Sequence, residues 1–407
     1  MSEALKAWGI ANRFAGSGDR AAIGNLVYDA LRRRASHAWA MGADTPRALI
    51  LSVAVRDWGE VPDALATGFA EDLHAPAAID AEELARLSAA DPLAGAPDHI
   101  RADLPEWSLA ALAGAFGDEL VAEGQAMAGR PPLDLRVNTL KSSRDRVMKG
   151  LHRFDPEATA ISPLGVRFSA GPRDARTPNV QSDEGFLKGW FEVQDQGSQL
   201  VSALTGAAAG EQVLDLCAGA GGKTLAMAAA MGNRGQIFAY DSDRSRLAPI
   251  YDRLKRNGAR NVQVRPPEPG ALSDLEGRMD RVVIDAPCTG SGTWRRRPDA
   301  KWKLTPEQVG QRTAEQAAIL DEGASYVKTG GSLVYITCSI LPAENEEQVA
   351  AFLAAHPDFE AHDPADLWQT HFAGAPSPKL SAAGITLTPH RTGTDGFFIA
   401  VLHRTGR

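Results

Sequence analysis

The residues of this sequence best suited to chemistry are its three cysteines, Cys217, Cys288 and Cys338, which all lie in short motifs. Cys288 follows the apolar run 282–284 in Asp-Ala-Pro-Cys-Thr-Gly-Ser-Gly, and Cys338 follows the apolar run 333–336 in Thr-Cys-Ser. Because ligands bind outside the carboxyl ends of the strands of an open parallel sheet, we expect both sulfurs to face one crevice. Three cysteines without close pairs suit neither a disulfide framework nor a zinc site. The pattern therefore indicates sulfur chemistry in a reducing compartment.

A glycine-rich loop at residues 215–224 lies between a predicted strand and a predicted helix, which indicates a cofactor site. A P-loop is excluded because Cys217 stands where its first glycine is needed, and a dinucleotide fingerprint is excluded because Thr224 replaces its third glycine. The remaining interpretation is a methyltransferase loop that binds S-adenosylmethionine. Asp241, at the end of the next strand, can take both ribose hydroxyls or, alternatively, cap the following helix. The loop residues expected at the cofactor are Cys217 (through its backbone), Ala218, Gly219, Ala220, Gly221, Gly222 and Lys223.

The elements that must position these residues follow an alternating pattern from about residue 206. Apolar runs at 212–216, 236–241, 281–285 and 332–337 are separated by helical segments, which predicts an α/β fold with a parallel sheet covered on both faces. A last run at 395–402 is predicted to close the sheet. Residues before about 128 have helical spacing, and Pro131-Pro132 interrupts it. We expect three domains: residues 1–129 helical, 130–205 a small α+β segment, and 206–407 the catalytic sheet.

Composition predicts a folded cytoplasmic protein, because 44% of the residues are hydrophobic and 23% are charged, with neither an amino-terminal signal nor a membrane-length apolar stretch. The net charge of −8 argues against a polyanionic partner, but basic residues gather in parts of the chain. Arg32–Arg34, Arg295–Arg297 and Lys301 could hold RNA phosphates, with a solvated surface as the alternative. Asp19 and Thr45 are predicted to cap helices. The nine histidines show no metal spacing, so we expect no metal.

Four motifs occur in one order: the Gly-Gly-Lys-Thr loop, Asp-Ala-Pro-Cys-Thr-Gly-Ser-Gly, Pro-Asp-Ala-Lys-Trp at 298–302, and Tyr-Ile-Thr-Cys-Ser. Together they resemble the RNA cytosine-C5 methyltransferases of the RsmB/NOP2/NSUN family, in the bacterial RsmB-like branch. Leu-Arg-Val-Asn at 135–138 and Val-Gln-Asp-Gln-Gly-Ser at 193–198 extend the likeness. The resemblance implies a Rossmann-like S-adenosylmethionine-dependent methyltransferase sheet preceded by a NusB-like helical RNA-binding domain. It also implies an rRNA or tRNA substrate, no membrane partner, and a monomer.

The family resemblance also implies a role for each site residue. Cys338 would add to C6 of cytosine and so activate C5, while Cys288 would assist release of the product. Asp285 would hydrogen-bond the base and lie at the cofactor, and Lys223 would favour the thiolate. The family usually has an Asp-Ala pair after the strand at 262–265, whereas this chain has prolines around Glu268, which could replace that aspartate at the adenine.

Two other functions stay open at this point. A DNA cytosine-C5 methyltransferase would use Pro287-Cys288 as its nucleophile motif, although the presence of Thr337-Cys338 favours RNA. A non-catalytic RNA-binding or assembly protein would use the helical domain for docking, and the intact set Lys223, Asp285, Cys288 and Cys338 argues against it. The target RNA and nucleotide are not readable, because structured RNA is recognised by shape and splayed-out bases.

Overall fold

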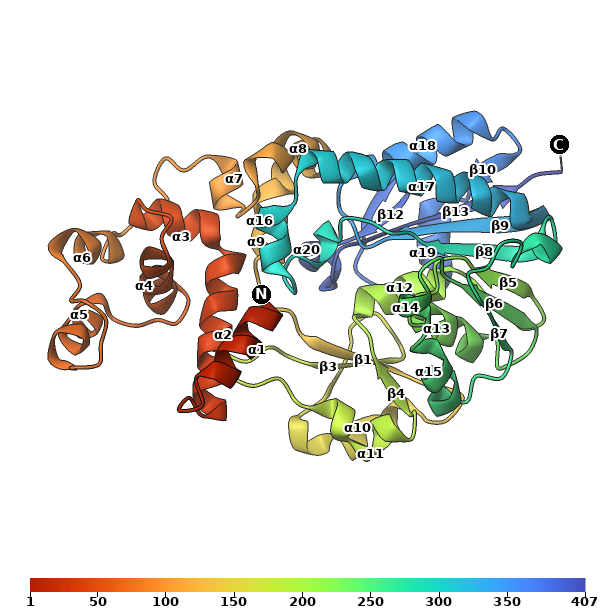
Figure 1. The fold of residues 1–407 in the computed structure, drawn as a ribbon. Helices are drawn as coiled ribbons and strands as arrows, with labels where there is room; N and C mark the ends of the chain where they lie inside the picture. The colour runs from red at the N-terminus through yellow and green to blue at the C-terminus, as the bar shows by residue number, and fades with distance from the viewer. Residues whose placement is uncertain (407) are drawn as a thin grey trace. The chain divides into compact units, whose positions relative to one another are not determined.

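The structure, a computed structural model, describes residues 1–406 and divides into two compact units (Figure 1). The first unit contains Met1–Pro131, Ala170–Thr177 and Trp294–Lys303. The second unit contains Pro132–Ser169, Pro178–Thr293 and the chain from Leu304 on. Two short segments that are distant in sequence therefore belong to the first unit, and the division into three domains stays a prediction.

The first unit is helical throughout its described secondary structure. Its helix α4 begins after Thr45, whose side chain accepts the Ala48 amide as the predicted cap. The prediction for Asp19 is wrong: α2 is preceded by Gly16, and Asp19 stands in the first turn, where its carboxylate accepts the Gly16 amide. Its helices are α1 Ser2–Ala11, α2 Ser17–Arg32, α3 Arg34–Met41, α4 Pro46–Arg56, α5 Pro62–Glu71, α6 Ala81–Leu87, α7 Asp98–Arg101, α8 Leu109–Phe116, α9 Leu120–Met127 and α16 Pro298–Lys303.

The second unit begins with a small antiparallel sheet in the order β2-β3-β1-β4. Leu135 and Val137 of β1 pack with Val166 and Phe191 in a separate apolar core. The elements of this part are β1 Leu133–Val137, α10 Arg144–Gly150, β2 Glu157–Ala158, β3 Gly165–Phe168, α11 Glu184–Leu187, β4 Phe191–Val193 and α12 Gln196–Leu204.

The large sheet of the second unit has the order β11-β12-β13-β9-β8-β5-β6-β7, and β10 also pairs with β13. Strands β7, β6, β5, β8 and β9 are parallel, as predicted, whereas β10 to β13 pair antiparallel, so the sheet is mixed. Its strands are β5 Gln212–Asp215, β6 Gln236–Tyr240, β7 Val262–Arg265, β8 Met279–Asp285, β9 Val327–Thr337, β10 Phe359–Ala361, β11 Lys379–Ser381, β12 Gly384–Leu387 and β13 Phe397–Arg404.

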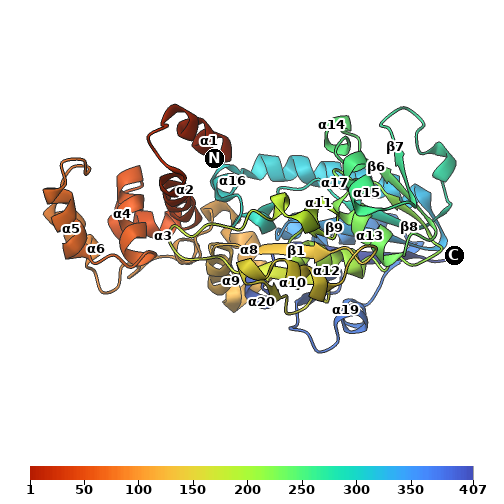
Figure 2. The ribbon, with the colours of Figure 1, turned by 90° about the horizontal axis from the view of Figure 1, so that it is seen from below.

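Helices cover both faces of this sheet, and the strands are apolar on both sides for that reason. Val282 and Ile284 of β8 pack with side chains of α17 and α18, whereas Val283 packs with those of α12, α13 and α19. Figures 1 and 2 show helices on both sides of the sheet. The chain runs from β5 outward to β7 and returns to place β8 on the other side of β5, so a topological switch point lies between these two strands. The helices are α13 Gly222–Ala230, α14 Arg244–Leu247, α15 Ile250–Asn257, α17 Pro306–Tyr326, α18 Glu346–Ala355, α19 Pro364–Phe372 and α20 Pro389–Thr392.

Candidate active site

Two neighbouring parallel strands bring the predicted cysteines together. β8 and β9 pair up to Asp285 and Ile336, and each chain then leaves the sheet at its carboxyl end. The Sγ atoms of Cys288 and Cys338 lie 3.3 Å apart, so the two sulfurs lie together as expected, whereas the crevice that they were expected to face stays a prediction. The Gly292 amide donates to the Cys338 carbonyl at 3.0 Å, which ties the two loops together.

The contact between the two sulfurs makes them chemically different. A hydrogen bond from the Cys288 thiol lowers the pKa of Cys338, although burial and the Asp285 carboxylate oppose this effect. The same hydrogen bond, together with burial and the charge of Cys338, raises the pKa of Cys288 well above its ordinary value. The pair therefore favours a Cys338 thiolate that accepts from a Cys288 thiol, and the thiolate is the nucleophilic form of cysteine.

Lys223 and Asp285 form an ion pair next to the sulfurs. Lys223 lies in the first turn of α13, and its Nζ is 2.6 Å from Asp285 Oδ2, with only 7% of the lysine side chain exposed. The positive charge of Lys223 is also one of the influences that lower the pKa of Cys338. The structure thus gathers Lys223, Asp285, Cys288 and Cys338, all of which the sequence analysis selected, at the carboxyl ends of β5, β8 and β9.

A buried glutamate, which the sequence analysis did not select, holds the two cysteine loops in place. Glu344 Oε1 accepts the Thr289 amide at 2.8 Å and Gln316 Nε2 at 3.0 Å. Its Oε2 accepts the hydroxyls of Thr289 at 2.6 Å and Ser339 at 2.5 Å. Thr289 and Ser339 each directly follow one of the cysteines. The only signal in the sequence was an acidic residue six positions after Cys338 and two positions after a proline.

The glycine-rich loop has the backbone form that its glycines permit. Gly219 and Gly221 have positive φ angles of 49° and 83°. At Gly221 a Cβ atom would come within 2.6 Å of Ile250, so a larger residue would not fit without a shift. The Gly219 amide donates to Asp241 Oδ2 at 2.9 Å, and Asp243, not Asp241, caps α14. The capping alternative for Asp241 is therefore wrong, and its carboxylate instead supports the loop.

The loop is also fastened to the small sheet. Arg253 donates to the Ala220 carbonyl at 2.7 Å and to Glu192 of β4 at 2.8 Å. Arg136 of β1 is buried, which lowers its pKa to about 10, and its Nε donates to Gln194 at 2.5 Å. One terminal nitrogen of Arg136 has no hydrogen-bond partner among the described residues. Arg253 of α15 thus links the glycine-rich loop to Glu192 of the small sheet.

Asp215, at the end of β5, is the group that best tests whether this loop fits a cofactor. Its Oδ2 accepts the Thr224 hydroxyl at 2.6 Å, whereas Oδ1 is buried without a partner among the described residues. Burial raises its pKa to about 7. A buried acceptor of this kind suits a cationic ligand group, and S-adenosylmethionine carries both an ammonium and a sulfonium. The sequence analysis did not select Asp215, although its place directly before the loop was a usable signal.

The two remaining cofactor candidates differ in their surroundings. Burial and three nearby aspartates raise the pKa of Cys217, so it stays a thiol, in agreement with the inert role expected for its side chain. Glu268 is mainly exposed, lies 3.4 Å from Arg244, and lines an open cavity of about 450 Å³ together with Tyr240, Glu322 and Tyr326. No described hydrogen bond or ion pair links Glu268 to the glycine-rich loop.

The expected phosphate contact by Lys301 is wrong. Lys301 is only 2% exposed, and its Nζ donates to the carbonyls of Arg32 and Asp103, both at 2.7 Å. Burial lowers its pKa to about 8. Arg32 is also buried, where it donates to the Arg295 carbonyl at 2.8 Å, and Arg295 itself is 5% exposed. These basic residues build the interior of the helical unit, because their side chains satisfy carbonyls that would otherwise be unpaired.

No group of acidic, histidine and cysteine side chains among residues 1–406 could hold a metal ion. No helix within the same range is long and apolar enough to span a membrane.

The chain is similar to known proteins over most of its length. Residues 203–403 match the family described as 16S rRNA methyltransferase RsmB/F, and residues 104–172 match its ferredoxin-like domain. The chain is 36% identical over 279 residues to the probable ribosomal RNA small subunit methyltransferase B of Synechocystis, covering 67% of this chain and 60% of the relative. It is 37% identical over 264 residues to the ribosomal RNA small subunit methyltransferase B of Klebsiella pneumoniae, covering 63% and 59%. The matched part therefore spans about 60% of the length of these curated relatives.

A solved structure extends the comparison to the fold. A methyltransferase homologue from Pyrococcus horikoshii is 27% identical and superposes with a TM-score of 0.62, over 75% of this chain and 97% of that chain. The overall fold is thus similar to that of a known methyltransferase homologue.

Proposed function

Because this chain belongs to the RsmB/F family of methyltransferases and has their Rossmann-like fold, we propose that it methylates C5 of a cytidine in structured RNA through a covalent bond between Cys338 and C6. The observation that supports this mechanism most is the 3.3 Å contact in which Cys288 lowers the pKa of Cys338. Small-subunit rRNA is the proposed substrate, since the relatives are rRNA small subunit methyltransferases. A tRNA cytidine is the alternative, and we place the reaction in the cytoplasm.

The proposed cofactor is S-adenosylmethionine, which supplies an electrophilic methyl group when bound. The residues proposed to hold it are those of the loop at 217–223, with Asp241 at the ribose and Asp215 near a cationic group. Asp285 is proposed to contact both cofactor and base, which is supported by its 2.6 Å ion pair with Lys223 of the loop. The adenine contact by Glu268 has the least support, because this residue pairs with Arg244 instead.

The reaction begins with the Cys338 thiolate, which forms a bond to C6 while the electrons of the C5–C6 double bond become available at C5. Asp285 and Lys223 are placed to stabilise charge that develops on the base. The hydrogen bond to Cys338 and its negative charge both raise the pKa of Cys288, and both influences end once the Cys338 sulfur is bonded to carbon. The pKa of Cys288 then falls, so that its thiol can release its proton to solvent. Once C5 carries the methyl group, the Cys288 thiolate would accept the proton from C5, and the electron pair of that C–H bond would re-form the C5–C6 double bond and expel Cys338 as a thiolate.

The helical unit is proposed to be a NusB-like RNA-binding domain. A non-catalytic assembly protein is the competing function, but such a protein would not need a Cys338 with a lowered pKa beside a lysine–aspartate pair.

The test uses unmodified small-subunit rRNA and labelled S-adenosylmethionine with wild type, Cys338→Ala, Cys288→Ser and, as a matched control, Cys217→Ser. Methyl transfer and denaturant-resistant protein–RNA adducts are measured together. We expect adducts to accumulate in Cys288→Ser, to be absent in Cys338→Ala, and to be normal in Cys217→Ser. If adducts form in Cys338→Ala but not in Cys288→Ser, Cys288 is the nucleophile and the two roles are reversed. A wild-type protein that methylates DNA instead of RNA, or that methylates neither, would overturn the proposal.

A further inference from the structure

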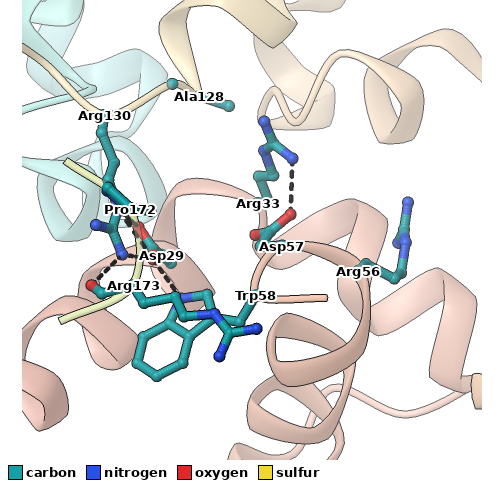
Figure 3. Close-up of a pocket in the computed structure, with 10 residues that line it drawn as sticks. Asp29, Arg33, Arg56, Asp57, Trp58, Ala128, Arg130, Pro172 and Arg173 are labelled. Atoms are coloured by element: carbon teal, nitrogen blue, oxygen red, sulfur yellow. Dashed lines mark hydrogen bonds and ion pairs between the residues drawn. The ribbon is translucent and has the colours of Figure 1, made fainter. Parts of the chain in front are cut away.

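The helical unit contains a cavity of about 280 Å³ that is lined mainly by charged side chains (Figure 3). Four arginines and two aspartates line it, although the protein as a whole carries a net charge of −8. All of the lining residues belong to the first unit. They are Asp29, Arg33, Arg56, Asp57, Trp58, Ala128, Gly129, Arg130, Pro172 and Arg173.

One side of the cavity is structural. Asp29 accepts from Arg130 Nε at 3.0 Å, from Trp58 Nε1 at 3.0 Å and from Arg32 at 2.9 Å. Arg130 also donates to the carbonyls of Gly171 and Arg173, both at 2.8 Å. The negative charge of Asp29 is therefore fully balanced inside the wall, and the donors of Arg130 are occupied.

The other three arginines retain donors for a ligand. Arg33 makes a single ion pair with Asp57, at 2.7 Å, and its side chain is 44% exposed. Arg56 donates to the Ser36 carbonyl at 3.2 Å and has no ion pair among the described residues. Arg173 pairs with Glu60 at 3.1 Å, and both side chains are nearly half exposed. Each guanidinium has five N–H donors, so each of the three retains donors that no described interaction uses.

Arg173 is held in a costly backbone conformation. Its φ angle is +42°, a region that a long side chain rarely adopts. Arg130 and Asn25 both donate to the Arg173 carbonyl, at 2.8 Å each, and fix this conformation. Strained residues that the surrounding structure holds in place occur preferentially at binding sites.

We propose that this cavity binds a backbone phosphate of the substrate RNA through the guanidinium groups of Arg33, Arg56 and Arg173. Guanidinium groups match the geometry of phosphate oxygens and form charge-assisted hydrogen bonds with them. At about 280 Å³ the cavity is slightly smaller than most ligand pockets, which suits one phosphate and its sugar better than a folded partner. The choice of RNA over an acidic protein segment rests on the proposed function. The site belongs to the helical unit, whereas the cysteines belong to the second unit, so the two contacts can be separated by mutation.

The experiment measures the Kd of the full chain for unmodified small-subunit rRNA over a series of KCl concentrations. One variant combines Arg33→Gln with Arg173→Gln. The other is Arg56→Lys, which keeps the positive charge but removes the paired N–H donors of the guanidinium group. Arg101→Gln is the matched control, because Arg101 is an exposed arginine of the same unit that also pairs with one aspartate. Thermal unfolding establishes that each variant is folded. We expect the double variant to bind RNA about tenfold more weakly. The slope of the logarithm of the binding constant against the logarithm of the KCl concentration should become shallower by about one unit for each phosphate contact removed.

In steady-state kinetics, the KM of the double variant for RNA should rise by a larger factor than its kcat falls. Its affinity for S-adenosylmethionine should be unchanged. A double variant with the wild-type Kd and salt slope, in an enzyme that methylates RNA, would overturn this inference and leave the proposed function intact. A normal salt slope combined with loss of a co-purifying protein would reassign the cavity to a protein partner. If the wild type binds RNA through these arginines but transfers no methyl group, the phosphate site stands and the proposed function fails.

Discussion

Glu344 accepts the hydroxyl of Ser339 at 2.5 Å, directly beside the nucleophile candidate, and the same carboxylate holds Thr289 beside the second cysteine. The relative position of the two sulfurs thus depends on a residue that does not touch either of them in a described hydrogen bond. Reactivity depends steeply on the distance between reacting groups, so a substitution at Glu344 should change the reactivity of both Cys288 and Cys338.

Glu344→Ala should destabilise the protein by about 3–5 kcal/mol and abolish adduct formation, because it leaves several buried donors unsatisfied. Glu344→Gln should keep most of the stability, since the hydroxyls of Thr289 and Ser339 can rotate to accept from the new amide. Urea unfolding and adduct yield check both variants, and Glu347→Ala, at an exposed position of α18, is the control. Equal stability of Glu344→Ala and wild type would contradict the structural role.

The pH dependence of cysteine alkylation should distinguish the three thiols. Cys338 has a pKa below the ordinary value of 9.0, so its thiolate, and its reaction with iodoacetamide, should appear at lower pH than those of Cys217 and Cys288. Loss of the donor in Cys288→Ala should move the Cys338 profile to higher pH, whereas Cys288→Ser keeps a donor and should move it less. Mass spectrometry of each peptide against pH measures this. An unchanged Cys338 profile in Cys288→Ala would show that the contact does not control its pKa.

Lys223→Met should slow adduct formation about a hundredfold, because the Asp285 carboxylate then remains unpaired near Cys338 and raises its pKa. Lys223→Arg keeps a positive charge and should recover part of the rate. The measurement is the rate of adduct formation against pH with saturating RNA. If Lys223→Met lowers the rate equally at every pH, its role is steric and not electrostatic.

Asp215→Asn should weaken binding of S-adenosylmethionine and alter the pH dependence of stability. The pKa of Asp215 is about 7 in the folded protein against an ordinary 3.8, so the folded state binds the proton more tightly than the unfolded state. This group therefore reduces stability progressively as the pH rises from about 4 to about 7, and asparagine should remove that decline. Calorimetry of cofactor binding and thermal unfolding between these pH values test the prediction, with Asp243→Asn as an exposed control. An unchanged affinity for S-adenosylmethionine in Asp215→Asn would contradict the proposal that Asp215 lies near a cationic group of the cofactor.

The strands and the site residues that end them were predictable from the sequence. Apolar runs at Val282–Ile284 and Leu333–Ile336 mark strands buried on both faces, and polar motifs directly after such runs must lie at the carboxyl edge of the sheet. Local pattern and chain direction are enough for that conclusion. This reasoning placed Cys288 and Cys338 at one edge of the sheet, and the family resemblance added the roles of Lys223 and Asp285.

Local pattern misled where burial depends on segments far apart in the chain. Lys301 lies in a basic stretch that resembles an RNA-binding loop, but it packs against the Arg32 carbonyl, 269 positions away in sequence. Its charge is satisfied by carbonyls whose positions depend on how the helices pack. The prediction that Asp19 caps a helix was wrong, and the adenine contact of Glu268 lacks support, for a related reason. A shift of a few ångströms decides which donor an exposed carboxylate meets.

The sequence alone therefore predicted an α/β sheet and the motifs at its carboxyl edge, because these follow from order and periodicity along the chain, whereas the methyltransferase family was predicted from the resemblance of four ordered motifs. Only the tertiary structure decided how those residues act. The difference in pKa between Cys288 and Cys338, the support of both loops by Glu344, and the arginine-lined cavity around Arg173 all arise from side chains that meet across long stretches of sequence. Hydrogen bonds and charge interactions act over a few ångströms in space, so their partners are set by packing and not by position in the chain.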